Sequence, residues 1–202
     1  MTIFCVTGFS GSGKSTLAKM LSESLHNSTL IHSDEFMYES VTYFQKDFER
    51  IFGLPIFEGN NTKTFRKPVI ESGIREWRAY LNLVLPYIDT CIEEKLAAVE
   101  ATSMNAVIDW VHLPLTRVWS YSQCRIVIAT SDAGTRRNQL FQRMLSREQY
   151  RQYSSEYLRR SIEMKDELDS MSLGNLEDCI VINNDYDKTF QLEAVRIARL
   201  FV

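Results

Sequence analysis

The chain has 202 residues, 45% of them hydrophobic, so it is long enough for one sizeable core and too short for two ordinary domains. Its formal net charge of -3 gives no field that would attract nucleic acid or an anionic membrane non-specifically. It contains no apolar stretch of about 18 residues and no recognisable secretion signal. We therefore expect a single cytoplasmic domain over residues 1–202, with a small-molecule partner and neither a nucleic-acid nor a membrane partner.

Short apolar runs near the amino terminus predict alternating strands and helices. Residues 3–7 form a β-branched run that ends at a glycine, and residues 28–32 form a second strand-like run. Between them, Leu17, Leu21 and Leu25 recur at helical spacing. This β-loop-α-β order is typical of the opening of an α/β domain.

The middle of the chain contains a long amphipathic segment. From residue 69 to residue 98, apolar side chains repeat every three to four positions, which predicts a helical stretch that Pro86 should bend or split. The less regular residues 53–67 include Gly59-Asn60-Asn61 and predict an exposed connection. The same residues are also the best candidate for a subdomain boundary.

Three further apolar runs complete the predicted sheet. They cover residues 106–110, 125–129 and 179–182, and each is apolar on both faces. Such strands occur in parallel sheets that helices cover on both sides. With a last helix over residues 190–201, the pattern predicts an α/β domain built on a five-stranded parallel sheet.

The segment from Gly8 to Ser15 reads Gly-Phe-Ser-Gly-Ser-Gly-Lys-Ser and matches G-x-x-x-x-G-K-[ST], the phosphate-binding loop or P-loop. It follows a predicted strand and opens a predicted helix, which is the context this motif requires. Its glycines leave the backbone amides open to phosphate oxygens, and the helix amino terminus adds to the anion site. The segment therefore predicts a binding site for a nucleoside triphosphate.

The residues of this loop have distinct predicted roles. Lys14 would reach the β- and γ-phosphates, where its charge offsets that of the transferring group, and Ser15 would offer its hydroxyl to Mg2+. The predicted nucleotide-binding residues of the loop and of the helix start are Gly8, Ser10, Gly11, Ser12, Gly13, Lys14, Ser15 and Thr16.

Two aspartates are predicted at the carboxyl ends of strands, where ligands bind in open parallel sheets. Asp34 follows the second strand and is our candidate for orienting an acceptor hydroxyl and accepting its proton, with Glu35 as the fallback. A helix cap formed by Ser33 or Asp34 is the structural alternative. Asp109 ends the third strand and could hold Mg2+ through a water, or simply bind a neighbouring backbone amide.

A basic segment from Asp132 to Arg160 contains seven arginines and three acidic residues. Because arginine suits phosphate groups, a helical segment at about residues 132–165 could close as a lid over the triphosphate. The spacing places Arg136, Arg143 and Arg147 near one helix face, and Arg143 is the favoured catalytic candidate. A solvated surface charge is the alternative for each arginine.

In this order the features resemble dephospho-coenzyme A kinase, within the larger group of P-loop kinases that includes uridine and nucleotide kinases. The resemblance runs over nearly the whole chain. Besides the P-loop, its segments are Ile31-His32-Ser33-Asp34, Phe52-Gly53, Arg66, Leu81-Asn82, Pro86-Tyr87-Ile88, Val107-Ile108-Asp109, Leu113-Pro114-Leu115, Arg137 to Ser146 and Ile180 to Asn184.

The resemblance implies a three-layer α/β/α P-loop NTPase fold with a helical substrate-binding insert at about residues 50–100 and an arginine-rich lid. It implies ATP and Mg2+ as ligands, and transfer of the γ-phosphate to a hydroxyl, with dephospho-coenzyme A as the leading acceptor. Asp34 would then be the acceptor-side carboxylate, Arg143 would belong to the lid and Asn183 would lie near the adenine of ATP. Arg66, together with Lys63 and Lys67, could hold an acceptor phosphate or simply form a charged, exposed loop.

Two departures from the family pattern fall on the acceptor side. Leu85 stands where the family usually has histidine, and no glutamate follows Leu113-Pro114-Leu115. The stretch from His32 to Tyr38 also resembles nucleoside and vitamin-riboside kinases, which are the alternative, and such an acceptor would rely on aromatic residues, namely Phe36, Tyr38, Tyr43 and Trp77. A nucleotide-dependent switch with slow hydrolysis is a third possibility, but the chain lacks a guanine-specificity motif.

Overall fold

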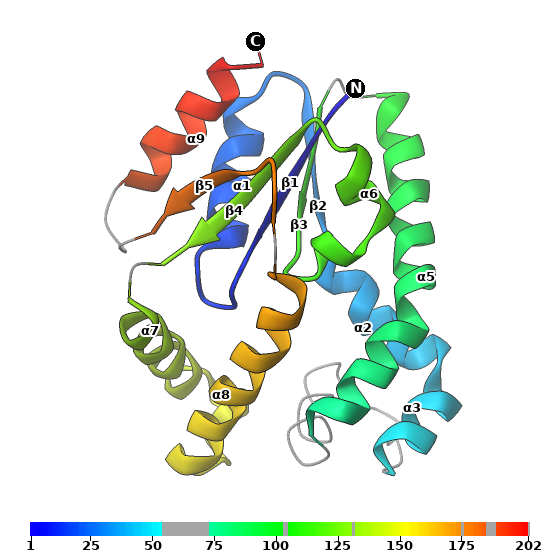
Figure 1. Cartoon of the computed structure of the whole chain (residues 1–202), viewed down its shortest axis with the longest axis vertical. Coiled ribbons are helices and arrows are strands. Elements are labelled where there is room, and N and C mark those ends of the chain that lie inside the picture. The colour runs from blue at the N-terminus through cyan, green and yellow to red at the C-terminus, as the bar shows by residue number, and fades with distance from the viewer. Residues whose placement is uncertain (54–72, 103–104, 131, 175, 185–188, 202) are drawn as a thin grey trace.

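The computed structural model describes residues 1–53, 73–102, 105–130, 132–174, 176–184 and 189–201. All five predicted strands are present and pair in parallel, in the order β2-β3-β1-β4-β5 (Figure 1). The strands are β1 (Thr2–Gly8), β2 (Ser28–His32), β3 (Asn105–Asp109), β4 (Cys124–Ala129) and β5 (Ile180–Asn183). The predicted fold class is therefore confirmed.

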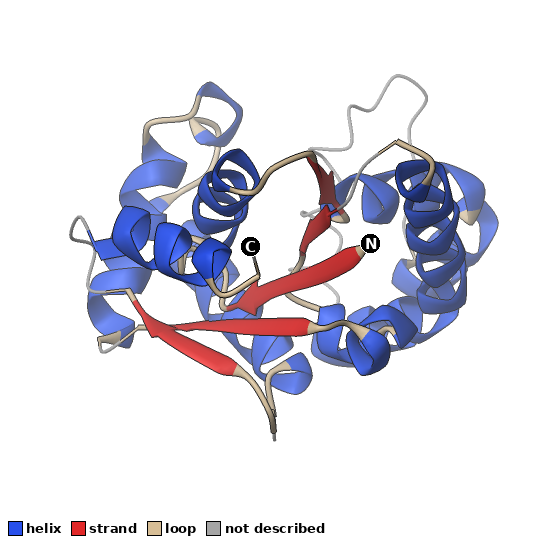
Figure 2. Ribbon diagram, turned by 90° about the horizontal axis from the view of Figure 1, so that it is seen from above, coloured by secondary structure: helices blue, strands red, loops and turns tan. Residues whose placement is uncertain are grey.

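Helices cover both faces of this sheet. On one face α1 (Lys14–Ser24) packs against α9 (Thr189–Arg199), and on the other α5 (Ile74–Glu100) packs against α6 (Arg117–Tyr121). Figure 2, seen from above, shows the twisted sheet between these two groups of helices. The fold has the three layers that the apolar strands predict.

The side chains of β1 show how the two cores are divided. Ile3 and Cys5 belong to the core on the α5 side, whereas Phe4 and Val6 belong to the core on the α1 and α9 side. Successive side chains of a strand point to opposite faces, so a strand that is apolar at every position must be buried on both faces. The central place of β1 in the sheet follows from its sequence.

The long helix α5 contains Pro86, which we expected to bend or split it. The proline lies inside the helix but does not split it, because α5 continues from Ile74 to Glu100. Proline removes one backbone donor from a helix. The buried face of α5, which includes Tyr80, Val84 and Ile88, packs into the core and offsets that loss. Residues 54–72, including Gly59-Asn60-Asn61, lie outside the described residues.

Two helical segments project beyond the carboxyl edge of the sheet, on opposite sides (Figure 1). On one side lie α2 (Asp34–Tyr43) and α3 (Gln45–Phe52), and α3 ends at Gly53 with a φ of +65°. On the other side α7 (Ala133–Leu145) and α8 (Ser155–Ser172) form what we call the α7–α8 arm. The arm occupies the predicted lid region and extends beyond it to residue 172.

The outer part of the α7–α8 arm has a small core of its own. Phe141 and Met144 of α7 pack there against Leu158 and Ile162 of α8.

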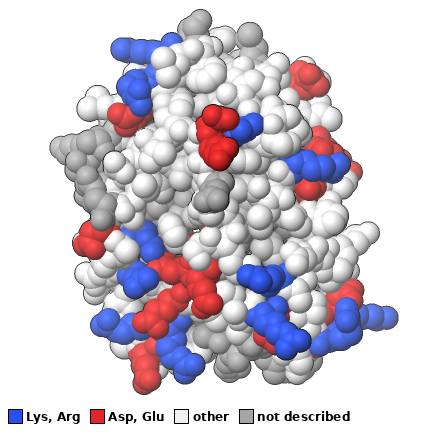
Figure 3. Space-filling view, viewed as in Figure 1, with Lys and Arg blue, Asp and Glu red and all other residues white. Residues whose placement is uncertain are grey.

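On the face seen in Figure 3, basic and acidic side chains are interspersed over the lower part of the molecule, so this face carries no patch of a single sign. None of the described helices is long and apolar enough to span a bilayer.

Candidate active site

The glycine loop passes so close to its neighbours that side chains are excluded at two positions. At Gly13, where φ is +98°, a Cβ would lie 2.5 Å from a ring carbon of Phe190 in α9. At Gly8 a Cβ would lie 2.5 Å from the carbonyl oxygen of Ile128 in β4. Gly13 is also the residue from which α1 begins. The loop is therefore fixed between β4 and α9 at both of its ends.

Lys14 is a half-buried cation at the start of α1. Its Nζ donates a hydrogen bond to the carbonyl oxygen of Phe9 at 3.1 Å. Burial lowers the pKa of Lys14 below its ordinary value, and the charges of Asp169 and Asp34 oppose that shift. A phosphate bound at the loop would supply the negative charge that stabilises this partly desolvated ammonium.

Asp109 links the loop to the edge of the sheet. Its Oδ2 accepts a hydrogen bond from the Ser15 hydroxyl at 2.6 Å, and its Oδ1 lies 2.5 Å from Nδ1 of His32. The side chain is buried at the end of β3, in register with His32 of β2. Each oxygen of the Asp109 carboxylate therefore contacts a side chain, and the two predicted Mg2+ ligands, Ser15 and Asp109, lie in contact.

The Ser15 hydroxyl and the Asp109 carboxylate suit Mg2+ better than they suit a metal whose ligands all come from the protein. Mg2+ takes oxygen ligands and usually keeps several waters, with one or two protein groups and substrate phosphates completing its shell. Within the described ranges, no cluster of three or more His, Cys, Asp or Glu residues could hold a metal ion. A hydroxyl and a carboxylate beside a phosphate loop fit an ion that arrives with a nucleotide.

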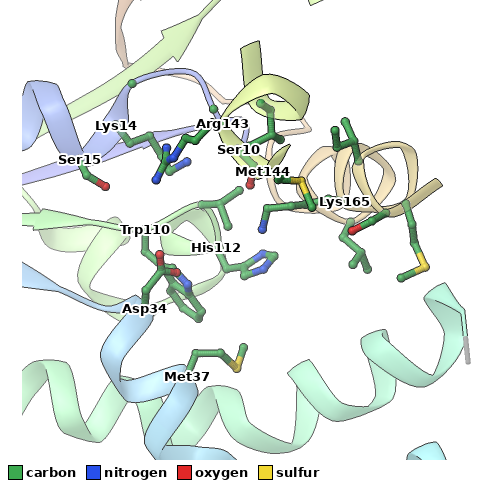
Figure 4. A pocket seen from close by; sticks show the side chains of 18 of the residues that line it. Ser10, Lys14, Ser15, Asp34, Met37, Trp110, His112, Arg143, Met144 and Lys165 are labelled. Atoms are coloured by element: carbon green, nitrogen blue, oxygen red, sulfur yellow. The ribbon is translucent and has the colours of Figure 1, made fainter. Parts of the chain in front are cut away.

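A cavity of about 470 Å³ opens beside the loop (Figure 4). The predicted loop residues that line it are Ser10, Gly11, Gly13, Lys14, Ser15 and Thr16, whereas Gly8 and Ser12 are buried. Its other charged lining residues come from α2 and the α7–α8 arm: Asp34, Arg143, Arg147 and Lys165. Charged groups from segments far apart in the sequence therefore converge on the space in front of the loop.

Asp34 is the first residue of α2 and lines the cavity on the side away from the loop (Figure 4). Ser33 is the N-cap residue, and its side chain makes no capping hydrogen bond, so the capping alternative does not describe this helix start. Glu35 is exposed and does not line the cavity. The geometry favours Asp34 over Glu35, although its catalytic role stays a prediction.

Comparison with known proteins identifies the fold. Residues 2–85 match the family described as AAA domain, and no curated protein matches the sequence. The structure is similar to TT1252 from Thermus thermophilus, with a TM-score of 0.61 and 18% identity over 99% of this chain and 96% of that one. It is also similar to a dephospho-CoA kinase from Campylobacter jejuni, with a TM-score of 0.56 and 16% identity over 98% of this chain and 96% of that one. The chain has the fold of a P-loop kinase.

Within this P-loop kinase fold, the arginines of the α7–α8 arm have different surroundings. Arg143 and Arg147 line the cavity, but Arg147 lies beyond the end of α7, so the expectation that it shares a helix face with Arg136 is wrong. Arg136 is only 2% exposed, and its guanidinium donates to the carbonyl oxygen of Ser10 at 2.8 Å. Arg136 therefore binds the backbone of the phosphate loop and not the open cavity.

Two residues predicted for the site remain, Asn183 and Arg66. Asn183 is exposed at the end of β5 and does not line the cavity. Its buried neighbour Asn184 contacts the loop instead, where its Nδ2 donates to the carbonyl oxygen of Ser12 at 2.7 Å. Arg66, the predicted acceptor-binding residue, lies outside the described residues, so its role stays a prediction.

The structure adds three residues that the sequence did not single out: His112, Lys165 and Asp169. His112 is buried against the cavity, and its Nδ1 lies 2.6 Å from the hydroxyl of Ser172 in α8. Burial lowers the pKa of His112 to about 4, so its imidazole is neutral near pH 7. The one available signal was its place directly after β3, at the edge where Asp109 also lies.

Proposed function

We propose that this chain is an ATP-dependent phosphotransferase that moves the terminal phosphate to a hydroxyl group of a small molecule. One observation carries the proposal. The phosphate loop, through Lys14 and Ser15, and a carboxylate suited to an acceptor, Asp34, line the same cavity (Figure 4). A protein that only bound a nucleotide would have no need for a carboxylate at that position.

On the donor side, the loop and Asp109 hold the nucleotide and its ion. The loop amides and Lys14 bind the phosphates, and the charge of Lys14 offsets the charge that develops on the transferring group. Ser15, with its hydroxyl, and Asp109, with its carboxylate, would hold Mg2+. The bound ion would neutralise charge on the β- and γ-phosphate oxygens.

On the acceptor side, Asp34 orients the hydroxyl and accepts its proton as the acceptor oxygen bonds to phosphorus and the bond to the leaving ADP breaks. Arg143 contributes positive charge from the α7–α8 arm. The cavity brings these groups close to one another, which reduces the entropy cost of aligning the two substrates. Substitution experiments can test the proposed roles of Asp34 and Arg143.

The acceptor has two candidates. Dephospho-coenzyme A is the first, because the order of motifs along the chain resembles its kinases. The basic residues near 63–67 that would bind its phosphates lie outside the described residues. A nucleoside or vitamin riboside is the second, and the cavity wall favours it, because Tyr38, Trp77 and Met37 line the same cavity as Asp34. Aromatic and thioether groups suit a flat, uncharged body.

The other two aromatic residues proposed for a nucleoside do not line the cavity. Phe36 is buried in the core, and Tyr43 is exposed and stacks on Tyr87 with 5.1 Å between ring centroids. The aromatic acceptor wall is therefore reduced to Tyr38 and Trp77 with the neighbouring Trp110.

An acceptor panel tests this proposal. The wild-type protein is incubated with Mg2+ and ATP labelled at the terminal phosphate, together with dephospho-coenzyme A, each common nucleoside or a vitamin riboside. We expect the label in one organic product, and no label transfer by a Lys14→Ala control. If ATP is bound but every acceptor stays unlabelled while phosphate is released slowly, a nucleotide-dependent switch replaces the kinase.

A further inference from the structure

Lys165 is a second lysine that faces the phosphate loop. It is half-buried on α8 and lines the cavity, and Figure 4 shows its side chain pointing into the space between Ser10 and His112. Among the residues that the structure describes, its ammonium forms no hydrogen bond or ion pair. An ammonium ion that is partly removed from water and has no counter-charge in contact is stabilised by binding an anion.

The position of Lys165 is fixed by two contacts that α8 makes after it. One turn further along α8, the buried carboxylate of Asp169 accepts a hydrogen bond from the backbone N–H of Ser10 at 2.6 Å. Ser172, three residues later, lies 2.6 Å from His112 through its hydroxyl. These spacings place all three side chains near one face of the helix. Helix α8 therefore rests against both the loop and the end of β3.

A second set of contacts joins the same helix to the loop through α7. Asp166 of α8 accepts hydrogen bonds from Arg136 at 2.7 Å and from Arg137 at 2.5 Å. Arg136 in turn donates to the carbonyl oxygen of Ser10. Both backbone polar groups of Ser10 are thus taken by the arm, so the loop and Lys165 keep a constant spacing.

Two carboxylates beside the cavity already have hydrogen-bond partners. Asp109 is occupied by Ser15 and His32, and Asp169 is occupied by Ser10. Lys14 and Lys165 line the same cavity, and the charge of Lys165 adds to burial, the main cause, in lowering the pKa of Lys14. A doubly charged phosphate between two such cations would satisfy both.

We propose that Lys165 binds the terminal phosphate of ATP, from α8, while Lys14 binds it from the loop. The inference rests on the proposed function. Lys165 lies between Ser10 of the proposed donor loop and His112, in the cavity that Asp34 also lines, so the group that passes between donor and acceptor is the one it faces. This makes Lys165 a catalytic residue, held in place by the Asp169–Ser10 contact.

Nucleotide affinity, measured without any acceptor, tests this inference. Binding of Mg2+-ATP and of Mg2+-ADP is compared by calorimetry for the wild type, Lys165→Met and Lys165→Arg. We expect Lys165→Met to bind ATP roughly 10- to 100-fold more weakly, the range for loss of a hydrogen bond to a charged group, with ADP affinity unchanged. Lys165→Arg should restore most of the ATP affinity, because it keeps the positive charge.

Two controls keep the result interpretable. Lys95→Met makes the same substitution at an exposed position of α5 and should leave both affinities unchanged. Melting temperatures report on folding, and Lys165→Gln is the second variant if Lys165→Met does not fold. Wild-type ATP affinity in the folded variant overturns the inference, and so does an equal loss for ADP and ATP, which would place Lys165 away from the terminal phosphate.

The outcomes also separate this inference from the proposed function. If the wild type binds ATP but phosphorylates no acceptor, the function fails while the difference between ATP and ADP still decides the role of Lys165. If Lys165→Met raises only the acceptor KM, Lys165 serves the acceptor and the inference is wrong. If the wild type binds neither nucleotide, both proposals fail.

Discussion

The proposed donor and acceptor halves of the site are built in different ways. The proposed donor half is one continuous segment, Gly8 to Thr16, completed by Asp109 of β3, which pairs with β1. The proposed acceptor half takes residues from α2, α5, the segment after β3 and the α7–α8 arm. A site made of consecutive residues depends on local backbone geometry, whereas a site made by packing depends on the whole fold. The two halves should therefore respond differently to substitution.

The largest expected effect comes from Lys14, which belongs to the donor half. Lys14→Ala removes the cation that offsets phosphate charge, and we expect transfer to fall by at least about 10³-fold. ATP affinity should fall in the same variant, because the phosphates lose a charged partner. Steady-state rates and calorimetry measure the two effects. Turnover close to that of the wild type would remove the loop from the mechanism.

Asp34 belongs to the proposed acceptor half. Its substitution should distinguish the two halves most clearly, because it should change kcat and not ATP affinity. Asp34→Asn keeps the size of the side chain but cannot accept the proton, so we expect kcat to fall by about 10²- to 10⁴-fold. ATP affinity should stay close to the wild-type value, because the side chain lies on the far side of the cavity from the loop.

Glu35→Gln is the matched control for that experiment, since Glu35 is the next residue of α2 and does not line the cavity. It should leave both the rate and the affinity unchanged. An Asp34→Asn protein with full activity, or a Glu35→Gln protein without it, would show that the carboxylate has been assigned to the wrong residue.

The smallest expected effect is on stability and concerns His112, which packs between β3 and α8. Its native pKa of about 4 lies below the ordinary 6.5, so the unfolded state binds the proton more readily. The contribution of neutral His112 is complete above about pH 6.5 and is lost as pH falls towards 4. It amounts to about 3 kcal/mol by linkage.

Unfolding by denaturant at several pH values measures this contribution. His112→Asn keeps a polar group near Ser172 but does not titrate, so the stability difference between wild type and variant should shrink as pH falls from 6.5 to 4. A constant difference across that range would mean that His112 is not held neutral by burial.

The sequence predicted those features whose causes are local. The glycine, lysine and serine spacing predicted the loop, and apolar runs predicted all five strands, which placed Asp34 and Asp109 at the correct edge of the sheet. Deep core packing held α5 together across Pro86, and no helical periodicity could indicate that. Local pattern was sufficient for the fold and for the donor half of the site.

The remaining features depend on contacts between residues far apart in the chain. Asp169 and Ser10 are separated by 159 positions, and Asn184 and Ser12 by 172. Arg136 belongs to a segment whose excess of arginine is typical of a solvated lid, but Asp166 and the Ser10 carbonyl group accept its hydrogen bonds in the interior. Neither charge balance nor spacing distinguishes such a buried arginine from an exposed one.

The fate of the terminal phosphate of ATP tests the central claim most directly. Wild-type protein and Asp34→Asn are each given labelled ATP, Mg2+ and a mixture of hydroxyl acceptors, and the products are separated. The claim that donor and acceptor halves form one transferase predicts label in an organic phosphate ester for the wild type, and ATP binding without transfer for Asp34→Asn. Label found only in inorganic phosphate, at the same rate in both proteins, would contradict it.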